Sequence, residues 1–175
     1  DPNSGGRQMP QHYGHKDLRI VSQSSPTGTQ FLQAVGCAMS RKWENDHEIV
    51  YVSSGEGSTS EGEFHEALNW ASREKLPIIF HIQDNEYAIS VHVSEQTSGS
   101  SVFSMVNGYD NLSRYEVDGT NFFETDLAFR EAIERARQGK GPSVIVSNVV
   151  RLLSHSSSDD QKKYRKKEDL DKDKN

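Results

Sequence analysis

The sequence predicts an α/β fold, with a mostly parallel sheet that carries helices on both faces. Short apolar runs rich in β-branched residues alternate with longer segments in which apolar residues recur at helical spacing. The segment "PIIFHIQ", which starts at Pro77, reads as a continuous apolar run of the type buried on both faces of a parallel sheet. Strands that alternate with helices form βαβ units with right-handed crossovers, and such units produce a parallel sheet.

The first half of the chain supplies an arm, two helices and two strands. Residues 1–25 are rich in Gly, Pro, Gln, His and Ser without a sustained period, so we expect an irregular arm. Apolar residues at helical spacing predict one helix over 27–43 and another over 61–75. A short β-branched strand is expected over 48–53, between the two helices, and the buried strand over 77–83 follows the second helix.

The second half of the chain repeats this alternation. A polar loop at about 90–110 precedes a strand and turn in "RYEVDGTN", and residues 122–138 form a helix that the following glycines stop. The apolar run "PSVIVSNVV" predicts another buried strand. We therefore expect one α/β domain over 26–153, followed by a loop and a charged segment over 154–175.

Composition limits the class of protein. The net charge is −6 and the lysines gather on no single predicted face, which argues against a nucleic-acid partner. No apolar run approaches the ~20 residues of a membrane span, and the single cysteine, Cys37, fits a reducing compartment. The sequence begins without methionine and ends in "QKKYRKKEDLDKDKN", so we expect it to be part of a longer protein.

A carboxylate flanked by glycines follows the first predicted strand. In the turn Gly55-Glu56-Gly57, glycines allow backbone N–H groups to approach a phosphate, but the carboxylate would repel that phosphate unless a cation lies between them. Mg²⁺ removes this conflict, because it takes one or two oxygen ligands from the protein and others from phosphates and water. Asn85 follows Glu56 by 29 residues, a suitable length for one helix and one returning strand, and is the second candidate ligand. Two ordinary turn residues are the alternative interpretation.

Several segments resemble a known motif. "GEG", "EGEFHEALNWA", "LPIIF" and "DNEYAIS", in this order, resemble the thiamine diphosphate motif. Further matches are "GGRQMPQHYG", "SSPTGTQFLQAVGCA", "VDGTN" and "RLLSHSSSDD", and together they cover nearly the whole chain. The chain is therefore similar to the α chains of 2-oxoacid dehydrogenase E1 components, particularly the branched-chain (2-oxoisovalerate) kind. The resemblance implies the thiamine diphosphate-binding fold, with a domain of the diphosphate-binding type.

The resemblance also implies roles for individual residues. Glu56, Asn85 and the backbone carbonyl of Tyr87 match the Mg²⁺ ligands of the family. Other cofactor-binding positions are matched by Ser25, Thr27, Gly55, Gly57, Ser58, Gln83, Ala88, Ile89 and His155. His155 further matches an active-site histidine, and Ser156 matches the position that is phosphorylated in mitochondrial relatives.

A monovalent cation is also implied. Positions that cradle such an ion, K⁺, in branched-chain members are matched by Ser24, Pro26, Thr29 and Gln30; a helix N-terminus is the alternative interpretation. The chain departs from the family where Gln83 replaces a frequent arginine, Asp84 replaces the first of two asparagines and Ser154 replaces the first of two histidines. His81 alternates along a buried strand and is interpreted as a core residue.

The implied reaction is the oxidative decarboxylation of a branched-chain 2-oxoacid, with acyl transfer to the lipoamide of an E2 lipoyl acyltransferase. In this family the cofactor lies between an α part and a β part, and the β part supplies the glutamate that activates it. We therefore expect an E1 β chain or a fused β region, in an α2β2 heterotetramer or a homodimer. The alternatives are a pyruvate or acetoin dehydrogenase, or a non-catalytic phosphate-binding or assembly module. The expected compartment is the bacterial cytoplasm or the mitochondrial matrix.

Overall fold

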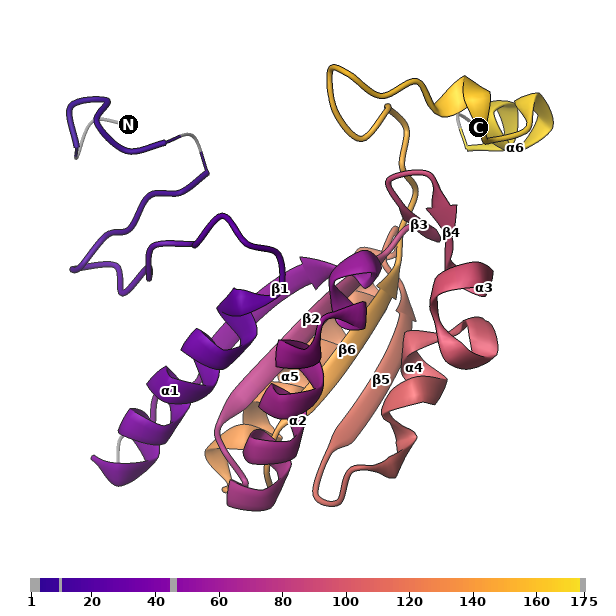
Figure 1. Ribbon diagram of the computed structural model, residues 1–175. Helices are drawn as coiled ribbons and strands as arrows, with labels where there is room; N and C mark the ends of the chain where they lie inside the picture. The colour runs from indigo at the N-terminus through magenta and orange to yellow at the C-terminus, as the bar shows by residue number, and fades with distance from the viewer. Residues whose placement is uncertain (1–3, 10, 45–46, 174–175) are drawn as a thin grey trace.

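The computed structural model describes residues 4–9, 11–44 and 47–173, and its centre is a four-stranded parallel sheet (Figure 1). The sheet comprises β1 (Val50–Gly55), β2 (Ile78–Asp84), β5 (Ser113–Asp118) and β6 (Ser143–Asn148), in the spatial order β1-β2-β6-β5. Each neighbouring pair is parallel. The carboxyl ends of these strands therefore meet at one edge of the sheet, which is where ligands bind in open α/β sheets.

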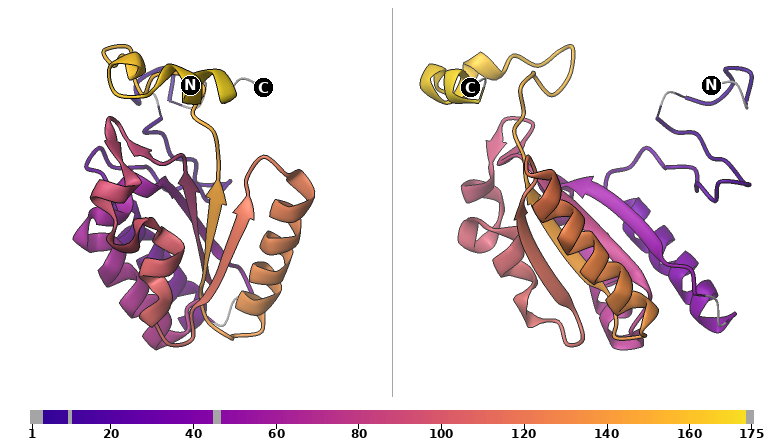
Figure 2. Two further views of the ribbon diagram at one scale, coloured as in Figure 1. Left: turned by 90° about the vertical axis from the view of Figure 1, so that its right-hand side faces the viewer. Right: turned by 180° about the vertical axis from the view of Figure 1, so that it is seen from behind.

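Helices cover both faces of the sheet. α1 (Thr29–Trp43), α2 (Gly62–Glu74) and the short α4 (Val102–Met105) lie on one face, and α5 (Phe122–Arg137) lies on the other (Figure 2). The predicted architecture, a parallel sheet with helices on both faces, is thus confirmed. Within the described ranges, no helix combines the length and the apolar character that a membrane span requires.

The apolar core forms two layers, one on each side of β2. Successive side chains of a strand point to opposite faces of the sheet. Ile78, Phe80 and Ile82 accordingly pack with the residues of α1 and α2, whereas Ile79 packs with Ile145 and the alanines of α5. Because β2 is packed on both faces, the core fixes the position of its carboxyl end next to that of β1.

Two observed boundaries differ from the predicted ones. α1 begins at Thr29 and not at residue 27, because Gly28 adopts a φ of 93°, outside the helical region. β1 begins at Val50, later than expected, and extends to Gly55. The other predicted helices and strands lie close to their expected positions.

The prediction of a polar loop at about 90–110 was wrong for much of that segment. It contains β4 (Val91–His92), α3 (Val93–Gln96), α4 and the 3₁₀ turns η2 (Ser98–Ser100) and η3 (Val106–Gly108). Val102 and Val106 are both fully buried and extend the core. These helices are too short for a helical period to be visible in the sequence, which explains the error.

The remaining elements are short and lie at or near the carboxyl edge of the sheet. η1 (Glu56–Ser60) connects β1 to α2, and β3 (Tyr87–Ala88) pairs with β4 in an antiparallel hairpin. After β6 the chain forms the 3₁₀ turn η4 (Gln161–Lys163) and the helix α6 (Lys167–Lys172). In Figure 1 the segment after β6 lies above the carboxyl edge, near the β3–β4 hairpin.

Candidate functional site

Glu56 and Asn85 lie at neighbouring strand ends. Gly55 of β1 pairs in parallel register with Gln83 of β2, so the residues just beyond both strands reach the same edge of the sheet. The backbone N–H of Asn85 donates a hydrogen bond to Glu56 Oε2 over 3.3 Å. The structure therefore brings together the carboxylate and the amide residue that the spacing predicts as neighbours.

Two buried oxygen atoms at this position have no hydrogen-bond donor. Glu56 is only 1% exposed. Among the described residues, neither Glu56 Oε1 nor Asn85 Oδ1 has a hydrogen-bond partner, although both atoms are buried. A buried acceptor without a donor costs about 1–3 kcal/mol. A cation can bind several oxygen acceptors at once, and Mg²⁺ prefers oxygen ligands, so this pair of atoms fits a Mg²⁺ ion.

The charge of Glu56 depends on its surroundings. Burial raises the pKa of the Glu56 carboxyl above its ordinary value, and the hydrogen bond from the Asn85 N–H opposes that increase. The charge of Asp84 raises this pKa further, while that of Arg151 lowers it. A bound cation would favour the ionised form. The described part of the chain holds no group of three or more His, Cys, Asp or Glu residues with metal-site geometry, so amide and backbone oxygens would have to complete the ligand set.

The hairpin after β2 lies directly against the turn after β1. A Cβ atom added at Gly57 would lie 2.8 Å from Ala88 Cβ, so this approach requires glycine. Tyr87 and Ala88 form β3, and Ile89 follows with a φ of 55°, which is rare for a β-branched residue. Ile89 is 53% exposed at the tip of the hairpin. Gly57, Tyr87, Ala88 and Ile89, all predicted site residues, are thus gathered at one place, with Ser58 next to Gly57 in η1.

The predicted pyrimidine-side residues, Ser25 and Thr27, are exposed and lie just before α1. Ser25 Oγ is 3.3 Å from His12 Nε2 in the arm. The next residue, Gly28, lies so close to the start of α2 that an added Cβ would be 2.8 Å from Glu61 Cβ. This contact places the segment beside the end of η1. Gln83 is exposed on β2.

The four predicted cation-binding residues at the start of α1 also lie together. Thr29 Oγ1 donates to the Pro26 carbonyl over 3.0 Å and is in hydrogen-bond contact with Ser24 Oγ. Gln30 Oε1 accepts a hydrogen bond from the Gly28 N–H over 3.1 Å. The same contacts are those of a helix N-terminus, so both interpretations of these residues agree with the geometry.

The Asp159 carboxylate restrains the loop that contains His155. His155 is exposed, and its backbone N–H donates to Asp159 Oδ2 over 2.9 Å. The Tyr164 hydroxyl donates to the same oxygen over 2.7 Å. These two hydrogen bonds, with that of Tyr164 first, lower the pKa of the Asp159 carboxyl. Ser156 is exposed, with its Oγ 3.2 Å from Ser158 Oγ.

Arg151 connects this loop to the hairpin, and its role was not foreseen from the sequence. One guanidinium nitrogen donates to the Ile89 carbonyl over 2.8 Å and another to the Tyr164 hydroxyl over 2.7 Å. The guanidinium also lies over the Tyr87 ring, 5.4 Å from its centroid, and Arg165 lies 5.2 Å from the same centroid. Two guanidinium groups therefore lie close to the Tyr87 ring. Only the position of Arg151, just after a buried strand at the carboxyl edge, could have drawn attention to it.

A cavity of about 560 Å³ opens beside these residues. Asn85 and Arg151 contribute to its wall, and the ends of β5 and β6 supply further lining residues. The ion pair between Arg165 and Asp173 forms part of the wall on the side of α6. The candidate ligand Asn85 therefore faces a space large enough for a small molecule.

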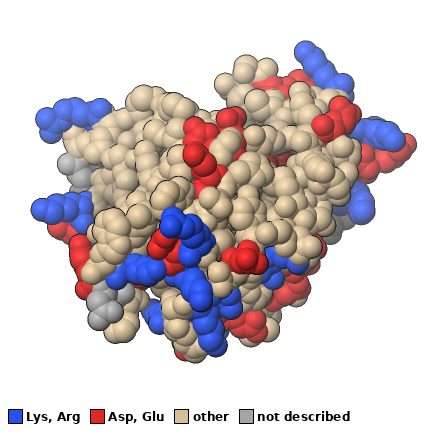
Figure 3. All heavy atoms as spheres, turned by 60° about the horizontal axis from the view of Figure 1, so that its bottom comes forward, with Lys and Arg blue, Asp and Glu red and all other residues tan. Residues whose placement is uncertain are grey.

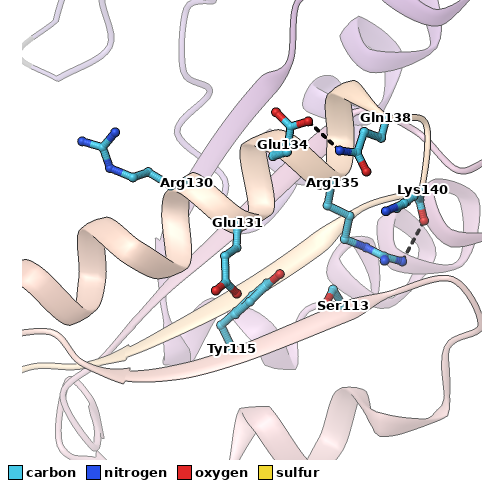
Figure 4. Close-up of a pocket in the computed structure, with 8 residues that line it drawn as sticks. All are labelled: Ser113, Tyr115, Arg130, Glu131, Glu134, Arg135, Gln138 and Lys140. Atoms are coloured by element: carbon cyan, nitrogen blue, oxygen red, sulfur yellow. Dashed lines mark hydrogen bonds between the residues drawn. The ribbon is translucent and has the colours of Figure 1, made fainter.

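A second hollow, of about 480 Å³, lies at the opposite edge of the sheet between α5 and β5 (Figure 4). Arg135 donates there to the backbone carbonyls of Asn111 and Lys140, which ties the end of α5 to the start of β5 and β6. None of the predicted site residues lines this hollow. Viewed from this end of the molecule, Lys and Arg side chains lie interspersed with Asp and Glu (Figure 3).

Comparisons with known proteins identify the family. The model of the family described as "Dehydrogenase E1 component" matches residues 1–175. The 2-oxoisovalerate dehydrogenase subunit alpha of Bacillus subtilis is 44% identical over 171 residues, covering 98% of this chain and 52% of the relative. The mitochondrial 2-oxoisovalerate dehydrogenase subunit alpha of Homo sapiens is 42% identical over 160 residues, covering 91% of this chain and 36% of the relative. The chain thus spans about half or less of the length of these curated relatives.

A further relative and a solved structure extend the comparison. The 3-methyl-2-oxobutanoate dehydrogenase subunit alpha of Mycobacterium tuberculosis is 39% identical over 149 residues, covering 85% of this chain and 40% of the relative. The crystal structure of transketolase from Campylobacter jejuni superposes with a TM-score of 0.63 at 22% identity, covering 75% of this chain and 21% of that one. At this identity the likeness concerns the fold alone.

Proposed function

Because the chain belongs to the dehydrogenase E1 component family, we propose that it forms the cofactor-binding part of the α subunit of a branched-chain 2-oxoacid dehydrogenase. The observation that carries the proposal is a pair of buried oxygens at adjacent strand ends, Glu56 Oε1 and Asn85 Oδ1, which lack a donor in the part of the chain that the structure describes. Relatives named 2-oxoisovalerate and 3-methyl-2-oxobutanoate dehydrogenase subunit alpha support a branched-chain substrate.

Glu56, Asn85 and the Tyr87 carbonyl would hold Mg²⁺ in this proposal, where its charge would offset that of a diphosphate. The other cofactor contacts come from Ser25, Thr27, Gly55, Gly57, Ser58, Gln83, Ala88, Ile89 and His155. When bound, thiamine diphosphate supplies the nucleophile for the keto carbon and the electron sink for decarboxylation. The chain itself binds and orients the cofactor: the glycine turn admits the diphosphate, and the β3–β4 hairpin, anchored by Arg151, fixes its position.

His155 serves as an acid–base group in this proposal, because an imidazole can take up or release a proton near neutral pH. The hydrogen bond from its backbone N–H to Asp159 restrains the loop that would present this imidazole to the cofactor. We assign Ser156 as a candidate phosphorylation site. A phosphate there would place negative charge close to the Asp159 carboxylate and would oppose the hydrogen bond between His155 and Asp159.

The partners follow from the same assignment. The name "subunit alpha" of the relatives implies a second kind of subunit. We propose an E1 β chain, or a fused β region, which completes the site in an α2β2 or homodimeric assembly, and an E2 lipoyl acyltransferase that accepts the acyl group. Residues 1–25 would be the arm, 26–153 the cofactor-binding domain and 154–175 the active-site loop with its charged segment.

Two finer assignments belong to the same proposal. The oxygens gathered at Ser24, Pro26, Thr29 and Gln30 suit K⁺, which would brace the segment that holds Ser25 and Thr27 against the cofactor. Relatives from bacteria and from mitochondria support the bacterial cytoplasm or the mitochondrial matrix as the compartment.

The test uses the full-length α chain assembled with its β subunit. Calorimetric titration with thiamine diphosphate and Mg²⁺ should show metal-dependent binding, and kcat/KM should be highest for 3-methyl-2-oxobutanoate among that acid, pyruvate and acetoin. A higher value for pyruvate or acetoin would reassign the substrate. Binding without turnover of any of the three would identify a non-catalytic phosphate-binding module. Absence of metal-dependent binding would overturn the proposal.

A further inference from the structure

Gln96, the last residue of α3, makes two hydrogen bonds to the turn that follows β1. Its Nε2 donates to the Gly57 carbonyl over 2.9 Å and to Ser60 Oγ over 2.8 Å. Gln96 is separated from these partners by 39 and 36 residues along the chain. One side chain therefore holds both the middle and the end of η1 from outside the turn.

These contacts link the two segments that carry the proposed ligands. Glu56 and Gly57 belong to η1, whereas Asn85 and Ala88 precede Gln96 in the hairpin segment. The two segments meet through the hydrogen bond from Asn85 to Glu56 and through the close approach of Gly57 and Ala88. Gln96 adds a third connection, at the far side of η1. Together these contacts restrain η1 against the segment that contains the hairpin.

The hydrogen bonds of the Gln96 amide suit a positioning role better than a folding role. Both Nε2 hydrogens are used, but Gln96 Oε1 is buried and has no hydrogen-bond partner in the described part of the chain. An acceptor buried without a donor offsets much of what the two hydrogen bonds contribute to folding. A side chain of this kind contributes little net stability, yet it fixes the direction in which η1 leaves β1.

We propose that Gln96 is a positioning residue for binding of Mg²⁺ and a diphosphate. It sets the distance between η1, which contains Glu56, and the segment after β2, which contains Asn85. This inference rests on the proposed function. The hydrogen bonds of Gln96 go to Gly57 and Ser60, so it acts on the proposed ligands through these two residues. Outer-shell hydrogen-bond partners of this type commonly change metal affinity by about 10–100-fold when they are removed.

The test compares three variants of the full-length chain assembled with its β subunit. Gln96→Leu keeps the size and removes both donors, and Gln96→Glu keeps the shape but cannot donate to the Gly57 carbonyl when ionised. Gln138→Leu is the matched control, because Gln138 is also a glutamine at the end of a helix: it caps α5, and its Nε2 donates to a nearby side chain, Glu134, at the opposite edge of the sheet (Figure 4). Three quantities are measured for each variant: the dissociation constant for Mg²⁺ at saturating thiamine diphosphate, the unfolding temperature without ligand, and kcat at saturating cofactor.

We expect the dissociation constant for Mg²⁺ to increase by about 10-fold or more in Gln96→Leu and further in Gln96→Glu. The ligand-free unfolding temperature and kcat at saturating cofactor should stay close to those of the parent, and Gln138→Leu should leave all three quantities unchanged. A Mg²⁺ affinity within about twofold of the parent would refute the positioning role. So would a drop in ligand-free unfolding temperature that accounts for the loss of binding. If the parent itself binds no Mg²⁺, the proposed function fails and this inference fails with it.

Discussion

Asn85 and Glu56 are joined by a hydrogen bond of 3.3 Å from the Asn85 backbone N–H to Glu56 Oε2, whereas Oε1 is buried and has no donor within residues 4–9, 11–44 and 47–173. Within the described residues, one oxygen of the Glu56 carboxylate therefore accepts a hydrogen bond and the other does not. Burial raises the pKa of this carboxyl, so its ionised form is less favourable than that of an exposed carboxyl, and a bound cation would favour it. A mutation that removes the Glu56 charge should consequently weaken Mg²⁺ binding without lowering the stability of the ligand-free protein.

Glu56→Gln should show this opposition. Removing the charge should weaken Mg²⁺ binding by about 10²-fold, or about 2.8 kcal/mol at ~1.4 kcal/mol per decade, while the ligand-free protein becomes as stable as the parent or more stable. Chelation of the metal from the parent should remove about 2.7 kcal/mol of stability if the ion is present at ~100 times its dissociation constant. Urea unfolding with and without Mg²⁺ measures both effects. Glu66→Gln, at an exposed position of α2, is the control, and equal Mg²⁺ stabilisation of parent and Glu56→Gln would contradict the assignment.

Gly57→Ala should separate the turn from the hairpin. The new Cβ would lie 2.8 Å from Ala88 Cβ and 3.3 Å from Ala88 Cα, so one of the segments must shift, at about 1–3 kcal/mol of stability. The double variant Gly57→Ala with Ala88→Gly should recover part of this loss, because it removes the nearer of the two contacts. Denaturant unfolding of the single and double variants measures the recovery.

A matched control is available in α1. Gly36 is exposed in mid-helix, and an added Cβ would meet nothing within 4 Å. Gly36→Ala should therefore stabilise the protein by about 0.5–1 kcal/mol. If Gly57→Ala behaved like Gly36→Ala, the close approach at Ala88 would not matter to the fold.

The placement of Glu56 and Asn85 could be predicted from the sequence because of how parallel units are built. An apolar run, a glycine turn and an amphipathic helix define β1, η1 and α2, and the next apolar run must return beside β1. Both strand ends then lie at the same edge, whatever the rest of the chain does. The 29-residue spacing between the two residues depends only on this local unit.

Other parts of the site depend on contacts between residues far apart in the sequence, which no local sequence pattern indicates. The chain order does not reveal that β6 lies between β2 and β5, since both apolar runs would suit either position. Gln96 and Arg151 reach partners 39 and 62 residues earlier in the chain. Single polar residues at such distances have no periodicity, so only the folded arrangement identifies them.

His81 should make stability depend on pH. Its Nδ1 is 2.8 Å from the Tyr51 hydroxyl and its Nε2 is 2.9 Å from Ser147 Oγ, and burial lowers its pKa below the ordinary value. Between that lowered pKa and the unfolded value of about 6.5, the unfolded chain binds more protons than the folded one. The free energy of unfolding should therefore decrease as pH falls through this window and should be fully retained above it.

His81→Gln should flatten this part of the pH profile, because glutamine does not titrate. Unfolding by urea at about pH 7.5 and about pH 5 gives the difference for the parent and the variant. His47→Gln, at an exposed position, should leave the difference as it is in the parent. An unchanged slope in His81→Gln would show that other groups cause the acid sensitivity.

His155→Ala tests the catalytic assignment of the loop after β6. His155 is exposed and its hydrogen bond to Asp159 is made by the backbone N–H, so removal of the imidazole should not disturb the loop or the fold. Loss of an acid–base group should reduce kcat of the assembled enzyme by about 10²–10⁴-fold, with little change in unfolding temperature. Ser157→Ala, at an exposed position of the same loop, should keep kcat near that of the parent.

A second variant, Asp159→Asn, weakens the hydrogen bonds that restrain the loop and keeps the imidazole. It should therefore lower kcat less than His155→Ala does. If His155→Ala retains turnover within a few-fold of the parent, the imidazole does not transfer a proton in the rate-limiting step, and the loop serves to shape the site.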